Sequence, residues 1–200
     1  MKITTLIISL FALSLTSCTW VLTSKEIKVF NKDNPVNTQS SFYLNYPKNG
    51  FQKTVFTRKL EENPDSAKEV VDTFRSTLSE GLGQLTISEK NLSLEAAFKD
   101  ASSKGNQYLI EVEIAQWKDA SYFLCASSQS PNGQYNEPTS MDTVDVTIFV
   151  YDAKTKKLLN KQTIDNRGCP IVFAGMIPIG KNSPSSRLSS MLGDWLNNIR

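Results

Sequence analysis

The chain has 200 residues, 40% of them hydrophobic and 21% charged, which is typical of one globular domain. Its formal charge of +2, from 22 basic and 20 acidic residues, is too balanced for the basic face that binds nucleic acid. The absence of histidine excludes a Ser-His-Asp triad, a Cys-His pair and a mixed Cys/His zinc site. Acyl-transfer and nucleotide-binding motifs are also missing, so the sequence predicts a non-enzymatic protein without a cofactor or metal.

The N-terminus has the pattern of a bacterial secretion signal. Lys2 precedes an apolar run, residues 3–15, which at about 13 residues is too short for a membrane-spanning helix of roughly 20. The run ends in Leu-Thr-Ser17-Cys18, which resembles the lipobox of bacterial lipoproteins. The resemblance implies cleavage between Ser17 and Cys18, a diacylglycerol on the Cys18 thiol and acylation of its new amine. An ordinary secretory signal with a chance cysteine is the alternative.

The predicted lipid on Cys18 decides where the chain is expected to reside. Several acyl chains on one residue give a stable membrane anchor. Thr19 follows the cysteine, and by resemblance to lipoprotein sorting in Gram-negative bacteria it favours the outer membrane, with the domain facing the periplasm. In a Gram-positive cell the same anchor would lie outside the cell membrane. We therefore expect a signal peptide at 1–17, a lipidated cysteine and tether at 18–40, and a single domain at 41–200.

The elements of this domain follow from hydrophobic periodicity and capping residues. After a short strand near 27–30 in the tether, we expect strands at 41–46, 85–87, 107–117, 144–151 and 158–164. Helices are expected to begin at Ser66, where Glu69 would complete a capping box, at Ser93, and at about Ser185. This order predicts an α/β (α+β) fold, with helices packed on a mixed sheet of about five strands.

Two further segments are expected to connect these elements. Residues 126–140 are polar, with two prolines and a glycine, and predict a long loop between two strands. Residues 170–184 are apolar but interrupted by glycine and proline, and are expected to cover the core or form an apolar lip.

Residues 66–200 resemble an uncharacterised family of short bacterial lipoproteins, domain of unknown function 4823. The resemblance depends on the helices SAKEVVDTFRSTL and LEAAFKDASSKG, the strand YLIEVEIAQWKD, a hairpin containing V-x-V-x-I-x-V-Y-D, and the C-terminal helix. The family has no known active site, so the resemblance implies no catalytic residue. The element order is also similar to that of α/β domains in envelope-assembly lipoproteins, and this analogy favours protein binding in the periplasm.

Cys125 and Cys169 are the two cysteines that remain after Cys18. Each follows a predicted strand, and both would reach an oxidising compartment in which disulfides persist. We interpret them as a possible structural disulfide, which would stabilise the fold by about 3–4 kcal/mol. Two buried thiols or a redox pair are the alternatives, although the absence of Cys-x-x-Cys argues against a redox catalyst.

Five further residues are candidates for a site. Trp117, Met191 and Trp195 form a possible partner face, and packing in the core is the alternative. Glu111 and Glu113 share one face of a strand at about 6–7 Å, a spacing that could serve glycoside hydrolysis, whereas an ordinary solvated strand face explains the same alternation.

Three functions follow from these observations, in order of preference. The first is a non-enzymatic, membrane-anchored envelope protein that binds another envelope protein. The second is a small-ligand or glycan binder, with 126–140 as lid and 170–180 as lip. The third is a hydrolase that depends on Glu111 and Glu113.

Overall fold

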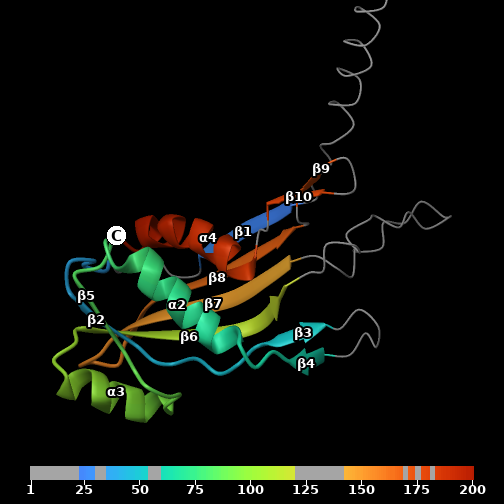
Figure 1. The fold of residues 1–200 in the computed structure, drawn as a ribbon. Coiled ribbons are helices and arrows are strands. Elements are labelled where there is room, and N and C mark those ends of the chain that lie inside the picture. The colour runs from blue at the N-terminus through green and yellow to red at the C-terminus, as the bar shows by residue number, and fades with distance from the viewer. Residues whose placement is uncertain are drawn as a thin grey trace, which may run out of the picture.

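The computed structural model describes residues 23–29, 35–53, 60–119, 142–168, 171–173, 177–180 and 183–200 (Figure 1). The signal peptide, the cleavage site at Ser17 and Cys18, the cysteines Cys125 and Cys169, and the loop 126–140 lie outside the described residues. The lipid anchor, the disulfide and the lid therefore stay predictions.

The described part of the chain contains ten strands and three helices. The strands are β1 (Thr23–Val29), β2 (Ser41–Leu44), β3 (Phe51–Lys53), β4 (Leu60–Glu62), β5 (Gln84–Ile87), β6 (Tyr108–Lys118), β7 (Asp142–Asp152), β8 (Leu158–Gly168), β9 (Ile171–Phe173) and β10 (Ile177–Gly180). The helices are α2 (Ser66–Leu78), α3 (Leu94–Ser103) and α4 (Pro184–Ile199). None of these helices is long and apolar enough to cross a lipid bilayer.

Eight of the strands form one mixed sheet, which confirms the predicted fold class. The strand order is β1-β8-β7-β6-β2-β5, and β3 pairs with β6 and with β4. β2 runs parallel to both β5 and β6, whereas β6, β7, β8 and β1 are antiparallel neighbours. The sheet has three strands more than the five expected. β3 and β4 are three residues long and too short to show alternation, and β1 lies in the segment expected to be a tether.

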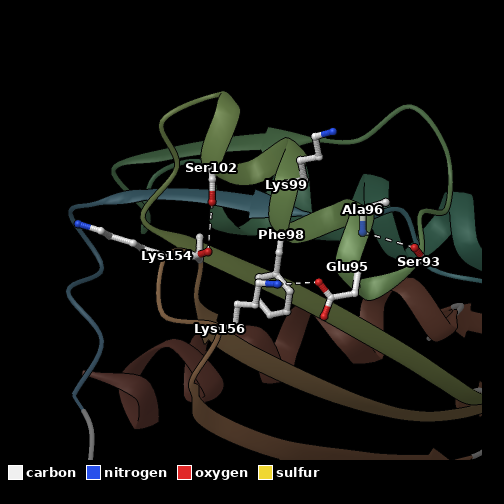
Figure 2. A pocket seen from close by; sticks show the side chains of 9 residues that line it. Ser93, Glu95, Ala96, Phe98, Lys99, Ser102, Lys154 and Lys156 are labelled. Carbon is white, nitrogen blue, oxygen red and sulfur yellow. Dashed lines mark hydrogen bonds and ion pairs between the residues drawn. The ribbon is translucent and has the colours of Figure 1, made fainter.

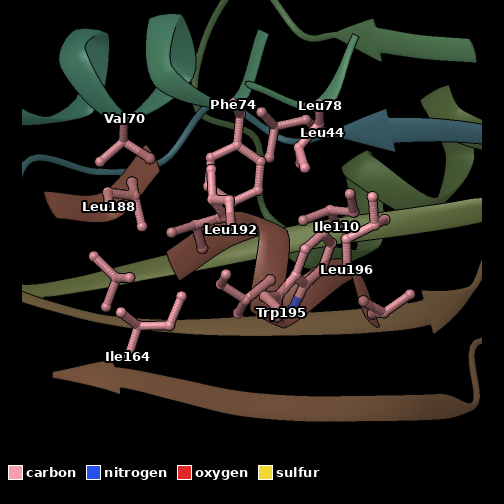
Figure 3. Close-up of a cluster of buried hydrophobic side chains, with 14 of the residues drawn as sticks. Leu44, Val70, Phe74, Leu78, Ile110, Ile164, Leu188, Leu192, Trp195 and Leu196 are labelled. Carbon is pink, nitrogen blue, oxygen red and sulfur yellow. The ribbon is translucent and has the colours of Figure 1, made fainter. Parts of the chain in front are cut away.

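One face of the sheet is covered by α2 and α4, which lie side by side on it (Figure 1). Phe74 of α2 meets Trp195 of α4 with ring centroids 6.1 Å apart, over the inward-facing residues of the strands (Figure 3). Met191 and Trp195 have no exposed surface, and Trp117 is 1% exposed. The prediction of a partner face at these three residues is therefore wrong, because their large apolar side chains pack in the core.

The helix starts show how similar signals lead to different contacts. Ser93 caps α3 as expected, because its Oγ accepts from the amide of Ala96 (3.4 Å). The capping box predicted at Ser66 is wrong, since Ser66 is the first residue of α2 and its Oγ instead accepts from the amide of Gly50 (2.8 Å). Glu69, the expected second member of that box, bonds Trp117 and not the start of the helix.

Among the described residues, a helix covers the opposite face of the sheet at one end only. Here α3 packs a small second cluster against β2 and β6 (Figure 1). The cluster is much smaller than the core under α2 and α4, and its buried members are Tyr43, Ala97, Phe98, Ala101, Leu109 and Ala153. The rest of this face has no described helix over it.

The segment expected to be a tether contributes to the domain. β1 pairs with β8 along its full length, from Thr23 opposite Gly168 to Val29 opposite Gln162. Val36 is 3% exposed in the main core, and its amide donates to the carbonyl of Ile199 (2.8 Å). The boundary predicted at residue 41 is thus corrected to the start of β1, so only a few residues separate Cys18 from the sheet.

Candidate interaction surface

We call the uncovered side of β6, β7, β8 and β1 the open face. Its side chains come from alternate positions of four adjacent strands, and all are exposed or half-buried while the residues between them are mostly buried. The open face comprises Glu26, Lys28, Glu111, Glu113, Asp145, Thr147, Phe149, Lys161, Thr163, Asp165 and Arg167.

Three carboxylates lie next to one another across the open face. The register places Asp145 opposite Asp165, and Asp165 opposite Glu26. Arg167 offsets this repulsion, because its Nε and Nη2 donate to the two carboxylate oxygens of Asp165 at 2.9 and 3.1 Å. Burial and the neighbouring Asp165 carboxylate nevertheless raise the pKa of Asp145.

A second acidic group lies at the border between the open face and α3. Glu111 is half-buried, and its Oε1 accepts from Asn45 Nδ2 at 2.8 Å. Burial raises the pKa of Glu111, the Asn45 hydrogen bond acts in the opposite direction, and the charge of Glu113 raises it further. The same Asn45 amide donates to the carbonyl of Leu92 (2.9 Å), which holds the segment before α3 against β2.

Glu111 and Glu113 share one strand face, as the alternation predicted. Both side chains project from β6 in the same direction, with Glu113 exposed. A pair that hydrolyses glycosides flanks the bond that it cleaves, from the two sides of the substrate. The described residues show both carboxylates on one side of β6, and a hydrolase that uses them stays a prediction.

Aromatic rings connect the open face to α3. Phe149 and Tyr151 stack on β7 with centroids 6.3 Å apart, and Tyr151 meets the edge of Phe98 at 5.4 Å. Lys161 lies with its Nζ 5.1 Å from the centre of the Phe149 ring. The middle of the open face therefore presents apolar and threonine surface between rows of charge.

Beside this aromatic row lies an open cleft between α3 and the turn from β7 to β8 (Figure 2). Its volume is about 590 Å³, and Lys156 crosses it to reach Glu95 (Nζ to Oε2, 2.6 Å) and to lie 5.7 Å from the centre of the Phe98 ring. The lining residues are Ser93, Glu95, Ala96, Phe98, Lys99, Ser102, Ala153, Lys154 and Lys156.

Sequence reasoning missed a buried ion pair on the covered face. Arg187 of α4 approaches Asp142 of β7 with Nε and Oδ2 3.8 Å apart, and the two side chains are 6% and 1% exposed. Arg187 also donates to Asn166 Oδ1 (3.2 Å), and its guanidinium lies where a Cβ on Gly168 would be, 2.6 Å from Nη1. An arginine within the apolar stripe of an amphipathic helix was the signal that could have predicted a buried partner.

The side chain of Glu69 provides a hydrogen-bond acceptor for the buried Trp117 indole. Its Oε2 accepts from Trp117 Nε1 (2.9 Å) and from Ser185 Oγ (3.1 Å), so one carboxylate joins α2, β6 and α4. These contacts tie the helices to the end of the sheet.

Among the described residues, no group of three or more acidic or cysteine side chains is placed to hold a metal ion.

Solved structures share this fold at low sequence identity. The PelC dodecamer from Paraburkholderia phytofirmans has a TM-score of 0.57 and 13% identity, over 88% of this chain and 97% of that one. A single-residue variant of that PelC, also a dodecamer, has a TM-score of 0.55 and 14% identity, over 88% of this chain and 100% of that one. Lipoprotein GNA1162 from Neisseria meningitidis has a TM-score of 0.44, which is too low to support a shared fold, and 13% identity over 80% of this chain and 99% of that one. No family model and no curated protein matches the chain, so the resemblance to the named lipoprotein family is not confirmed.

Proposed function

We propose that this chain is a lipid-anchored protein of the bacterial envelope that binds another envelope protein through the open face, without catalysing a reaction. The open face is the observation that carries the proposal. It joins four strands into one surface that combines stacked aromatic rings, threonines and both signs of charge. Such a mixture supports specific protein contact, because apolar area supplies affinity while placed charges set orientation.

The position of the anchor supports the same proposal. β1 begins five residues after Cys18, and β8, its neighbour in the sheet, also carries the open face. A lipid on Cys18 would hold this surface close to the membrane, at a fixed end of the sheet. The similarity of the fold to PelC, whose solved form is a dodecamer, adds a second copy of this chain to the candidate partners.

Site-specific photocrosslinking tests the proposal in the native host. A photoreactive residue replaces Lys161 on the open face in one full-length variant, and Lys68 on the exposed side of α2 in a second, matched variant. We expect position 161 to give one dominant crosslinked envelope protein, or a dimer of the chain itself, and position 68 to give neither. Equal, scattered products from both positions would contradict a specific partner on the open face.

A small anionic ligand is the second candidate, and the cleft of Figure 2 favours it. Lys99, Lys154 and Lys156 line the cleft around Phe98, and Lys156 lies beside the Phe98 ring while it pairs with Glu95. Isothermal titration with an acidic oligosaccharide such as oligogalacturonate would test it. Binding that is lost in the Lys154→Ala/Lys156→Ala variant would support this function, and the absence of heat with the parent chain would remove it.

A further inference from the structure

The described residues expose three large apolar side chains, and two of them lie on one pair of strands. They are Phe51 (48% exposed), Leu60 (62%) and Leu94 (41%). Phe51 and Leu60 both belong to the β3–β4 pair, in which Phe51 is opposite Glu62 and Lys53 is opposite Leu60. Because directly opposed residues and alternate residues of a strand share a face, Phe51 and Leu60 lie on the same side of this pair.

The sheet register fixes where this apolar pair lies along the strands. Phe51 is opposite Gln116 of β6, and the ladder continues from Gln116 through β7 and β8 to Glu26 of β1. Since β3 is parallel to β6, and β1 runs the other way, Leu60 is about level with the second residue of β1. The β3–β4 pair thus extends towards the end of the sheet at which β1 begins (Figure 1).

A second apolar segment leaves from the same end. β8 ends at Gly168, which is the partner of Thr23, and β9 begins three residues later. β9 and β10 form a separate antiparallel pair with the sequences Ile-Val-Phe and Ile-Pro-Ile-Gly. The β3–β4 pair with Phe51 and Leu60, the β9–β10 pair and the N-terminal strand therefore lie at one end of the domain (Figure 1).

The length of chain before β1 places the membrane at this end. Thr23 is five positions after Cys18, and an extended chain covers at most about 3.6 Å per position, or roughly 18 Å in total. β3 and β4 are four and five strands away from β1 across the sheet, which corresponds to about 19 and 24 Å. A bilayer held at the start of β1 would therefore also be within reach of Phe51 and Leu60.

We propose that the β3–β4 pair is a second membrane contact, which inserts Phe51 and Leu60 into the lipid surface beside the anchor. The occupant of this apolar surface is the bilayer that carries the lipid on Cys18, so the inference rests on the proposed lipid anchor. Two contacts about 19–24 Å apart fix the tilt of the sheet as well as its distance from the membrane. Their effect is to hold the open face in one orientation towards its neighbours.

Fluorescence quenching on the full-length, lipidated protein tests the contact. Leu60→Trp places an indole at the proposed contact, and Leu94→Trp places one on α3, which packs near the opposite end of β6. Both positions are exposed, so both variants should fold. Trp117 and Trp195 are buried, and Trp20 is common to both variants, so it cancels in the comparison. The vesicles are phosphatidylethanolamine and phosphatidylglycerol, with and without bromine on the acyl chains.

We expect brominated lipid to remove the emission added by Leu60→Trp and to leave the emission added by Leu94→Trp unchanged. Equal behaviour of the two variants in protein that floats with the vesicles would overturn the membrane contact while leaving the anchor intact. Protein that carries no lipid and does not float would instead overturn the anchor, and with it this inference. Flotation of each sample on a density gradient therefore separates the two failures.

Discussion

The two faces of the sheet are built from the same strands but differ in burial and in the kinds of side chain that they carry. On the covered face, alternate residues of β6, β7 and β8 meet α2 and α4, and the side chains there are almost entirely buried. On the open face, the intervening residues are charged, hydroxylated or aromatic and keep contact with solvent. The period of two in a strand allows one sequence to encode both surfaces, so stability and recognition can change independently. Four predictions test that separation.

The largest expected effect is on the covered face. Phe74→Ala removes a fully buried ring that packs on Trp195, and should lower the free energy of unfolding by about 3–5 kcal/mol. Phe149→Ala is the matched change on the open face, where the ring is half-buried, and should cost about 1 kcal/mol. Urea titrations of both variants measure the difference. Equal losses would mean that the open face also carries a core.

The buried ion pair should be almost as sensitive. Asp142→Ala leaves the Arg187 guanidinium in a site that burial already disfavours, since burial lowers the pKa of Arg187 while Asp142 acts against that shift. Removing one partner of a buried pair costs about 3 kcal/mol or more. The double variant Asp142→Leu/Arg187→Met, measured by the same titration, should regain part of this loss. A double variant less stable than the single one would show that the charges themselves are needed.

A smaller effect is expected at the turn from β7 to β8. Asp152 Oδ1 accepts from the amides of Lys154 (3.1 Å) and Thr155 (2.7 Å) and from the Thr155 hydroxyl (2.9 Å), and these bonds lower the pKa of Asp152. Asp152→Ala should cost about 1–2 kcal/mol at neutral pH.

The pH dependence of this loss gives its signature. A carboxylate whose folded pKa is depressed contributes stability above its unfolded pKa of about 4, and loses it as the pH falls through the folded value. The difference between the parent chain and Asp152→Ala should therefore shrink below pH 4 in thermal melts. A constant difference across that range would assign the effect to lost hydrogen bonds alone.

The smallest effect is expected at Glu111, with the opposite sign. Burial raises its pKa, so the folded chain disfavours the ionised form, and stability is fully present below the unfolded pKa and lost as the pH rises through the folded one. Glu111→Gln keeps an acceptor for Asn45 and removes the buried charge. The variant should be slightly more stable than the parent at pH 7 and equal to it at pH 4, whereas Glu113→Gln, at an exposed position, should change little at either pH.

The sequence by itself determined the long elements and their inner faces. The middle parts of β6 and β7 alternate apolar and polar residues, and α4 carries an apolar stripe, so local periodicity was enough to predict them. β8 has mostly polar residues at its buried positions, and it was predicted as the partner strand of a hairpin with β7. The sequence also determined that Ser93 caps the N-terminus of α3. The helix ends just before Gly105, which adopts a φ of +72° that favours glycine. The predicted lipid site at Cys18 belongs to the same class of local signal.

Only the tertiary structure decided which surface is free. Trp117, Met191 and Trp195 look the same in sequence whether they face a partner or a core, because burial depends on whether α2 and α4 cover that face. Ser66 and Glu69 match a capping box, yet each finds a better partner in a distant segment. The pairing of β1 with β8 and of β3 with β6 depends on contacts far apart in the chain, and those contacts bring Thr23 and the exposed Phe51 and Leu60 to one end.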